Sequence, residues 1–300
     1  MRVIGVLIGF SESDPSAAPR IANFEQGLRE LGWFKGRNIL IHYRFAAQPD
    51  QLKAHARELA LMQLDLIVAG TGLVASALLQ EATTVPIVFV TSINPVATGF
   101  VTALQRPGGN LTGFTNNIPS MGGKWLELLK QVAPNITRVA IMFNPDTAPF
   151  SASHFIPTVE AAAASVAVQA SVMPVRGPTE IESALAELGP AQGLVVIPDT
   201  TMMRYRALII EHAARFRVPA IYPARYFAME GGLMSCGADL LDLYRRTPSY
   251  VDRILRGSKP ADLPVQAPSK VDLVINLRAA GALGLSVPRI VIARASEVIE

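Results

Sequence analysis

The chain has 300 residues, which is enough for two domains of ordinary size, each with its own hydrophobic core. Half of the residues are hydrophobic and 17% are charged, which excludes an intrinsically disordered protein. The net charge of +3 is spread thinly, and its densest cluster, Arg245-Arg246 with Arg253 and Arg256 nearby, is too weak to predict nucleic-acid binding. The single cysteine, Cys236, excludes an intramolecular disulfide and is expected to be a small buried residue.

The longest apolar run near the N-terminus is Val3–Phe10, which contains Gly5 and leads into the acidic sequence SESDPS. This run is too short for a membrane span or a signal peptide. We therefore expect a soluble chain without a direct membrane span. If the natural product is exported, its signal has been removed and replaced by Met1.

The first part of the chain alternates between strand and helix patterns. The expected elements are strand 2–10, helix 18–31, strand 39–45, helix 49–62, strand 64–69, a helix from residue 72 to about Ala82, and strand 87–90. Gly32 ends the first helix at the position that glycine favours. Strand 39–45 alternates apolar and polar residues, which is typical of a sheet edge. This order predicts a parallel sheet with right-handed crossovers.

The stretch from Pro86 to Asn117 is central to this half. Its strand, 87–90, is apolar throughout, so both of its faces must be covered inside a parallel sheet. The strand leads into the polar loop 91–95, at the strand end where open α/β sheets bind ligands. A turn and a second short strand lead to Asn116, where we expect the chain to cross to a second lobe.

From Met121 the pattern begins again and predicts a second doubly wound unit. The expected elements are helix 124–132, strand 139–143, helix 155–167, strand 168–173, helix 179–188, strand 193–197, helix 202–216, and strands 220–222 and 233–235. The tail is expected to form helix 240–255, an extended proline-rich segment 259–268, strand 271–276, a helical turn 277–283 and a last strand 290–293. A tail that adds to both units indicates more than one crossing, which would act as a hinge.

Polar side chains collect at the predicted carboxyl ends of the strands in both halves. Hydroxyls, amides and the N–H groups of helix starts suit a carboxylate, and isolated aspartates of the second half suit an ammonium group. Aromatic residues beside these loops would stack on an apolar ligand. Each polar residue has an alternative role as a helix cap or turn former. The predicted ligand-binding residues are Phe10, Ser11, Gly70, Thr71, Thr91, Ser92, Asn94, Asn116, Asn144, Asp199, Tyr222 and Asp239.

Catalytic and cofactor signatures are missing from the sequence. It has no G-x-S-x-G elbow, P-loop or H-E-x-x-H, and no G-x-G-x-x-G follows a strand. The four histidines are far apart, which favours solvated or packed roles over a metal site. Gly108-Gly109 is interpreted as a turn rather than a phosphate loop. We therefore expect no catalytic residues, no metal and no cofactor.

Longer segments resemble a known family over nearly the whole chain. They include FEQGLRELGW, LQRPGGNLTGFTN, KWLELLKQVAP, GGLMSCG and ILRGSKPADLPVQAPSKVDLVINL, and the combination of RPGGNLTGF, KPADLPV and LVINL is specific. On these segments the chain resembles ABC-transporter substrate-binding proteins of the type that includes tryptophan and tyrosine transport components. It departs from them at Asn94, where relatives often have an aspartate, and at Cys236, where a tyrosine is frequent.

This resemblance implies a type I periplasmic-binding-protein fold, with two Rossmann-like α/β lobes, a ligand cleft between them and a hinge of three crossovers. The expected lobes are residues 1–116 with 239–265, and residues 117–238 with 266–300. The resemblance also implies a periplasmic, non-catalytic component of an ABC importer, whose partner is the membrane permease. Its ligand would be a small molecule captured by lobe closure, either an aromatic or branched amino acid or a related carboxylate.

Two other functional classes stay open. A two-lobed transferase or racemase would use the same cleft, although a two-base cysteine racemase needs two cysteines and a sugar-nucleotide transferase needs more charged groups. A ligand-sensing domain of a regulator shares the fold, but no helix-turn-helix precedes Val3 in this sequence. Permease and ATPase genes beside this one would distinguish the importer from both classes.

Overall fold

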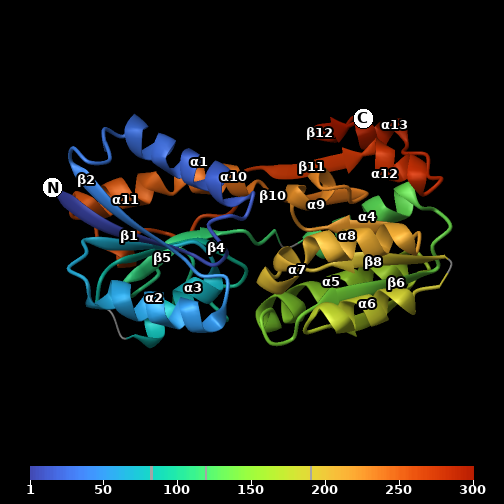
Figure 1. Ribbon diagram of the computed structural model, residues 1–300, viewed down its shortest axis with the longest axis horizontal. Helices are drawn as coiled ribbons and strands as arrows, with labels where there is room; N and C mark the ends of the chain where they lie inside the picture. The colour runs from blue at the N-terminus through green and yellow to red at the C-terminus, as the bar shows by residue number, and fades with distance from the viewer. Residues whose placement is uncertain (82–83, 119, 190) are drawn as a thin grey trace. The chain divides into compact units, whose positions relative to one another are not determined.

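The computed structural model describes residues 1–81, 84–118, 120–189 and 191–300, which form two compact units (Figure 1). Unit 1 is Met1–Asn117 with Asp239–Ser269, and unit 2 is Ile118–Ala238 with Lys270–Glu300. The chain therefore passes between the units three times. Unit 1 reaches Asn117 rather than residue 116 at the first crossing, and Ser269 rather than residue 265 at the third. The role of these units as hinged lobes stays a prediction.

Unit 1 contains a five-stranded, fully parallel sheet in the order β2-β1-β3-β4-β5. Its elements are β1 (Arg2–Ile8), α1 (Ala17–Glu30), β2 (Ile39–Phe45), α2 (Pro49–Leu61), β3 (Leu66–Ala69), α3 (Gly72–Gln80), β4 (Ile87–Ser92), β5 (Leu111–Thr115), α10 (Leu240–Arg246), α11 (Pro248–Leu255) and a 3-10 turn (Pro260–Asp262). The parallel sheet and the edge position of β2 are confirmed. Ala82, the expected end of the third helix, lies outside the described residues.

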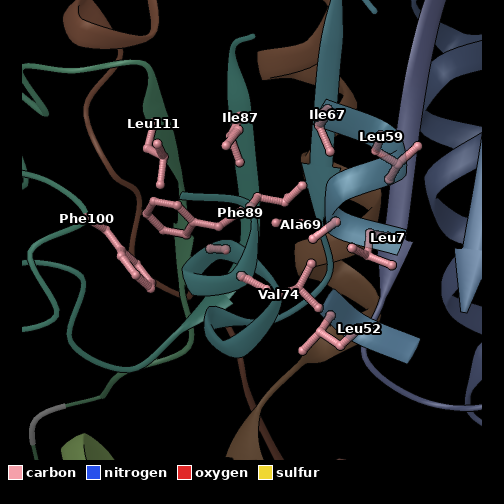
Figure 2. Close-up of a cluster of buried hydrophobic side chains, with 14 of the residues drawn as sticks. Leu7, Leu52, Leu59, Ile67, Ala69, Val74, Ile87, Phe89, Phe100 and Leu111 are labelled. Carbon is pink, nitrogen blue, oxygen red and sulfur yellow. The ribbon is translucent and has the colours of Figure 1, made fainter. Parts of the chain in front are cut away.

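Helices cover both faces of this sheet, which explains why its central strands are apolar throughout. α2 and α3 cover one face, and α1, α10 and α11 cover the other (Figure 1). Figure 2 shows the side covered by α2 and α3, where Leu59 and Val74 meet strand residues such as Ile67. Phe89 of β4 packs against Phe100 from the following loop, with ring centroids 6.1 Å apart. This packing fixes the strand ends that carry the polar loops.

Unit 2 contains a seven-stranded sheet in the order β12-β11-β10-β9-β8-β6-β7, in which β10 and β11 are antiparallel and the other pairs are parallel. Its elements are α4 (Met121–Val132), β6 (Arg138–Phe143), α5 (Pro149–Ser165), β7 (Gln169–Pro174), α6 (Pro178–Ala186), β8 (Gln192–Val196), α7 (Thr200–Arg204), α8 (Arg206–Arg215), β9 (Ala220–Tyr222), α9 (Arg225–Met229), β10 (Met234–Ala238), β11 (Val271–Asn276), α12 (Leu277–Ala282), α13 (Arg289–Ile292) and β12 (Glu297–Ile299). The strands that return after the third crossing complete this sheet.

Cys236 lies in the core of unit 2, as predicted. Its side chain is fully buried beside Met121, and burial raises the pKa of its thiol to about 11. The indole Nε1 of Trp125 donates to the Cys236 carbonyl at 2.6 Å, and the Trp125 ring packs on Phe155 of α5 at 4.9 Å. Cys236 is therefore a structural residue with an unreactive thiol, packed between the sheet and helices α4 and α5.

Three predictions about individual elements were wrong. The expected strand 290–293 is helix α13, and the last strand is β12; a short apolar run cannot be assigned by periodicity alone. The expected helix 240–255 is two helices, because Pro248 lacks the N–H that would continue α10 and instead begins α11. The expected helix 202–216 is also two helices, with Tyr205 ending α7 and preceding α8. Across the described chain, no helix combines the length and apolarity needed to cross a membrane.

Candidate ligand-binding site

The carboxyl ends of the parallel strands in unit 1 lie at one edge of the sheet, where small residues let the loops come close together. A Cβ on Gly9, after β1, would lie 3.1 Å from the Thr71 Oγ1. A Cβ on Gly72 would lie 3.6 Å from the Ser92 Oγ at the end of β4. The structure thus brings the predicted residues Thr71 and Ser92 together, beside the first turn of α3.

Two of the hydroxyls at this edge, those of Thr71 and Thr91, already have partners within unit 1. Thr71 caps α3, with its Oγ1 accepting from the Val74 N at 3.3 Å. The Thr91 Oγ1 donates to the Gly70 carbonyl at 3.0 Å, and the same carbonyl accepts from the Tyr244 Oη at 3.3 Å. Capping and turn formation therefore account for part of the polar pattern, although a hydroxyl that donates one hydrogen bond can still accept another.

The ends of β4 and β5 are joined by further hydrogen bonds. The Ser92 carbonyl accepts from the Thr115 Oγ1 at 2.6 Å and from the Asn116 N at 3.2 Å. Asn94 forms a turn in the loop after β4, with its Oδ1 accepting from the Ala97 N at 3.2 Å. Ser92 is buried, while Asn94 and Asn116 are partly exposed. These contacts hold the loop after β4 against the start of the first crossing.

A buried cation lies beside the predicted aromatic residue Phe10. The Arg20 guanidinium lies 4.7 Å from the centre of the Phe10 ring and 5.8 Å from that of Tyr244. Arg20 is 5% exposed, so the guanidinium lies mostly inside unit 1. Sequence reasoning missed it, although Arg20 stands four residues before Phe24 on the buried face of α1. Ser11, by contrast, is exposed and bonds the Ser13 hydroxyl at 2.8 Å.

In unit 2, the loops after the neighbouring strands β6 and β8 form a compact polar network. Asp199 is its centre and accepts from the Thr147 Oγ1 at 2.6 Å, the Thr201 N at 2.9 Å and the Asn144 N at 3.1 Å. Burial raises the pKa of the Asp199 carboxyl, and these hydrogen bonds oppose that shift. We call Asn144, Thr147, Asp199 and Thr201 the unit 2 network.

Both the oxygen and the nitrogen of the Asn144 carboxamide form hydrogen bonds. Its Oδ1 accepts from the Asp146 N at 2.8 Å and the Thr147 N at 3.3 Å. Its Nδ2 donates to the Arg176 carbonyl and to the Thr201 Oγ1, each at 3.3 Å. Sequence reasoning found Asn144 and Asp199 but missed both threonines, which stand three and two residues after them in strand-end loops. A threonine two or three residues after an asparagine or aspartate at the end of a buried strand is typical of a hydrogen-bonded turn, and this spacing could have identified both threonines.

Two predicted residues have structural roles in their own units. Tyr222 is 1% exposed and stacks on Phe227, with ring centroids 4.7 Å apart, inside the core of unit 2; burial raises the pKa of its phenol. Asp239 is the N-cap of α10 and accepts from the Asp242 N at 3.0 Å. The ligand-binding roles of Tyr222 and Asp239 stay predictions that no contact here supports.

The sequence matches one family along almost its whole length. Residues 6–299 match the family described as ABC transporter substrate binding protein. A relative from Clostridioides difficile (strain R20291), named Tyrosine-binding protein, is 25% identical over 274 residues, which cover 90% of this chain and 78% of the relative.

Solved structures agree with this match. An ABC domain from Streptococcus pneumoniae in complex with L-Trp has a TM-score of 0.90 and 24% identity, with 99% of each chain covered. A conserved domain protein from Vibrio cholerae has the same TM-score and coverage at 26% identity. A periplasmic binding ribose operon repressor protein from Lactobacillus acidophilus is more distant, with a TM-score of 0.59, 14% identity, and 90% of this chain and 96% of that chain covered. The expected type I periplasmic-binding-protein fold is confirmed, and the chain belongs to the ABC transporter substrate binding protein family.

Proposed function

We propose that this chain is the solute-binding component of an ABC importer and that its ligand is an aromatic amino acid, with tyrosine as the first candidate. The family match carries this proposal, because residues 6–299 include both units and all three crossings. The ligand class follows the Clostridioides difficile relative, which is named for tyrosine. The Streptococcus pneumoniae structure, which supports only the fold, makes tryptophan the second ligand to test.

The strand-end edge of unit 1 is suited to the carboxylate of such a ligand. The Thr71 hydroxyl accepts from the Val74 N and can still donate to a carboxylate, whereas the Thr91 O–H already donates to the Gly70 carbonyl. The first turn of α3 adds N–H groups and the positive end of a helix dipole. Phe10 beside this edge is partly exposed and carries the Arg20 guanidinium on its ring, so a ligand ring would have to stack on its other face. These features support binding of a small anion with an apolar side chain and assign no catalytic role to any residue.

We further propose that the ligand is captured by closure of the two units about the crossings. A ligand that binds one conformation more tightly shifts the population toward it, and the closed form would be the one that the membrane permease reads. Three crossings at 117–118, 238–239 and 269–270 give the chain the connections of a hinge. As part of this proposal, the protein works in the periplasm with the membrane permease as its partner.

A thermal-shift screen of the purified chain tests the ligand class. Tyrosine, tryptophan and phenylalanine should raise the melting temperature by several degrees, since a ligand at 100 times its Kd stabilises by about 2.7 kcal/mol. Leucine, isoleucine and valine form the branched arm, and aromatic carboxylates without an amino group form a third arm. A larger rise in melting temperature with a branched amino acid would show that the ligand is branched rather than aromatic. No rise with any of these compounds would reject the amino-acid proposal.

A further inference from the structure

Asn116 and Asn117 end unit 1 at the first crossing, and their backbone is held firmly. The Asn116 N donates to the Ser92 carbonyl at 3.2 Å, and the Asn117 N donates to the Thr115 Oγ1 at 2.9 Å. Thr115 itself is fixed between the Gln266 carbonyl, 2.8 Å from its N, and the Ser92 carbonyl. The positions of these two asparagines are therefore set by the sheet.

The side-chain oxygens of both residues are shielded from solvent and receive no hydrogen bond from any described part of the chain. A buried acceptor without a donor costs about 1–3 kcal/mol, and folded proteins satisfy most such groups. Two of them on consecutive residues at a strand end need a reason. In a binding protein, a ligand that reaches such an acceptor can supply the missing hydrogen-bond donor.

The aspartate that the sequence favours for an ammonium group is much less available. Asp199 already accepts from the Thr147 Oγ1, the Thr201 N and the Asn144 N, which together take three of the roughly four acceptor positions of a carboxylate. Asp239 caps α10 through one hydrogen bond, which it accepts from the Asp242 N at 3.0 Å. Two of the buried acceptors that lack a donor among the described residues lie side by side at the end of β5.

We propose that the carboxamide oxygens of Asn116 and Asn117 accept hydrogen bonds from the ammonium group of the ligand. Asn117 is the new residue in this assignment, and the inference rests on the proposed function. An α-ammonium group carries three donors, so it can satisfy both oxygens and still bond elsewhere. Because the two acceptors are neutral, recognition depends on hydrogen bonds to a charged donor, which are stronger than those between neutral groups.

The test is a thermodynamic cycle between protein and ligand. Calorimetry measures the Kd of L-tyrosine and of its desamino analogue, 3-(4-hydroxyphenyl)propionate, for the wild type, Asn116→Leu and Asn117→Leu. The wild type should bind tyrosine about 10–100-fold more tightly than the analogue, the range expected for hydrogen bonds to a charged group. In each variant this preference should fall to a few-fold, because each substitution removes one of the two oxygens that recognise the ammonium group.

Asn110→Leu is the matched control, since Asn110 stands at the opposite end of β5 and donates to the Val85 carbonyl at 3.1 Å. It should keep the wild-type preference. If Asn116→Leu or Asn117→Leu keeps the full preference, the assignment of that residue is overturned, even where the variant binds both ligands more weakly, as loss of a hinge role would cause. If the wild type binds tyrosine but does not prefer it to the analogue, only this inference fails. If the wild type binds no aromatic amino acid, the proposed function fails as well.

The ligand-free variants supply a second readout. Asn117→Leu removes an unsatisfied acceptor, so its melting temperature without ligand should equal or exceed that of the wild type. A melting temperature lowered by several degrees would identify Asn117 as a structural residue and would also overturn the assignment.

Discussion

The polar loops of the two units look alike in sequence but differ in how their groups are satisfied. In unit 2, Asn144, Thr147, Asp199 and Thr201 bond one another at distances of 2.6–3.3 Å. In unit 1, hydrogen bonds hold the strand ends together, yet the oxygens of Asn116 and Asn117 receive no donor from the described residues. The comparison teaches that residues of the same type at strand ends can satisfy one another, as in the unit 2 network, or keep an unused acceptor, as Asn116 and Asn117 do.

The largest expected effect is on the stability of unit 2. Asp199→Ala removes a helix cap and leaves the Asn144 N and the Thr147 hydroxyl without their acceptor, so it should lower the free energy of unfolding by about 2–4 kcal/mol. Asp146→Ala, in the neighbouring loop, breaks only an exposed pair with Arg176 and should cost below about 1 kcal/mol. Urea denaturation measures both, and equal midpoints would show that the unit 2 network has no structural role.

A smaller effect is expected in the pH dependence of stability. Burial raises the pKa of Asp199 above its ordinary value of 3.8, so the folded chain keeps this proton at a pH where the unfolded chain has lost it. The unfolded state then binds fewer protons, and the contribution of Asp199 to stability falls as the pH rises from about 3.8 through the raised pKa. The free energy of unfolding of the wild type, measured relative to that of Asp199→Asn, should therefore decrease as the pH rises through this window. A relative gain would mean that the hydrogen bonds to the carboxylate outweigh its burial.

The smallest stability effect is expected in unit 1. Thr91→Ala and Asn94→Ala each remove one hydrogen bond in partly exposed loops and should each cost below about 1 kcal/mol. Both should weaken ligand binding, because their side chains lie at the edge where we place the ligand. Denaturation and ligand titration of the same samples separate the two effects. Normal binding by both variants would restrict Thr91 and Asn94 to forming turns.

Much of the fold follows from patterns that the sequence displays. The largely apolar runs at 64–69 and 87–90 predict buried parallel strands, and the alternation of 39–45 predicts the edge strand β2. Local signals failed where two interpretations fit one pattern. The apolar run at 290–293 is compatible with strand or helix, and Pro248 can either interrupt a long helix or begin a new one.

The candidate site was harder to predict, because residue type does not reveal which partners a side chain will have. Asn144 and Asp199 were expected to face a ligand, but the sequence does not show that Thr147 and Thr201 satisfy them. Tyr222 follows the pattern of an aromatic strand end, and only its stacking on Phe227 reveals a core residue. Asn117 was not among the predicted ligand-binding residues, because an unmet hydrogen bond leaves no signal in a sequence.

Binding of tyrosine to the wild-type chain is the most direct test of this account. Calorimetric titration at several temperatures should give a single saturable site with one tyrosine per chain. The heat-capacity change should be negative, because the ligand buries its aromatic ring. Titration of tryptophan and phenylalanine in the same way would show which of the three aromatic amino acids has the lowest Kd. No saturable binding of any of the three at ligand concentrations up to about 1 mM, where even a weak Kd is detectable, would contradict the account.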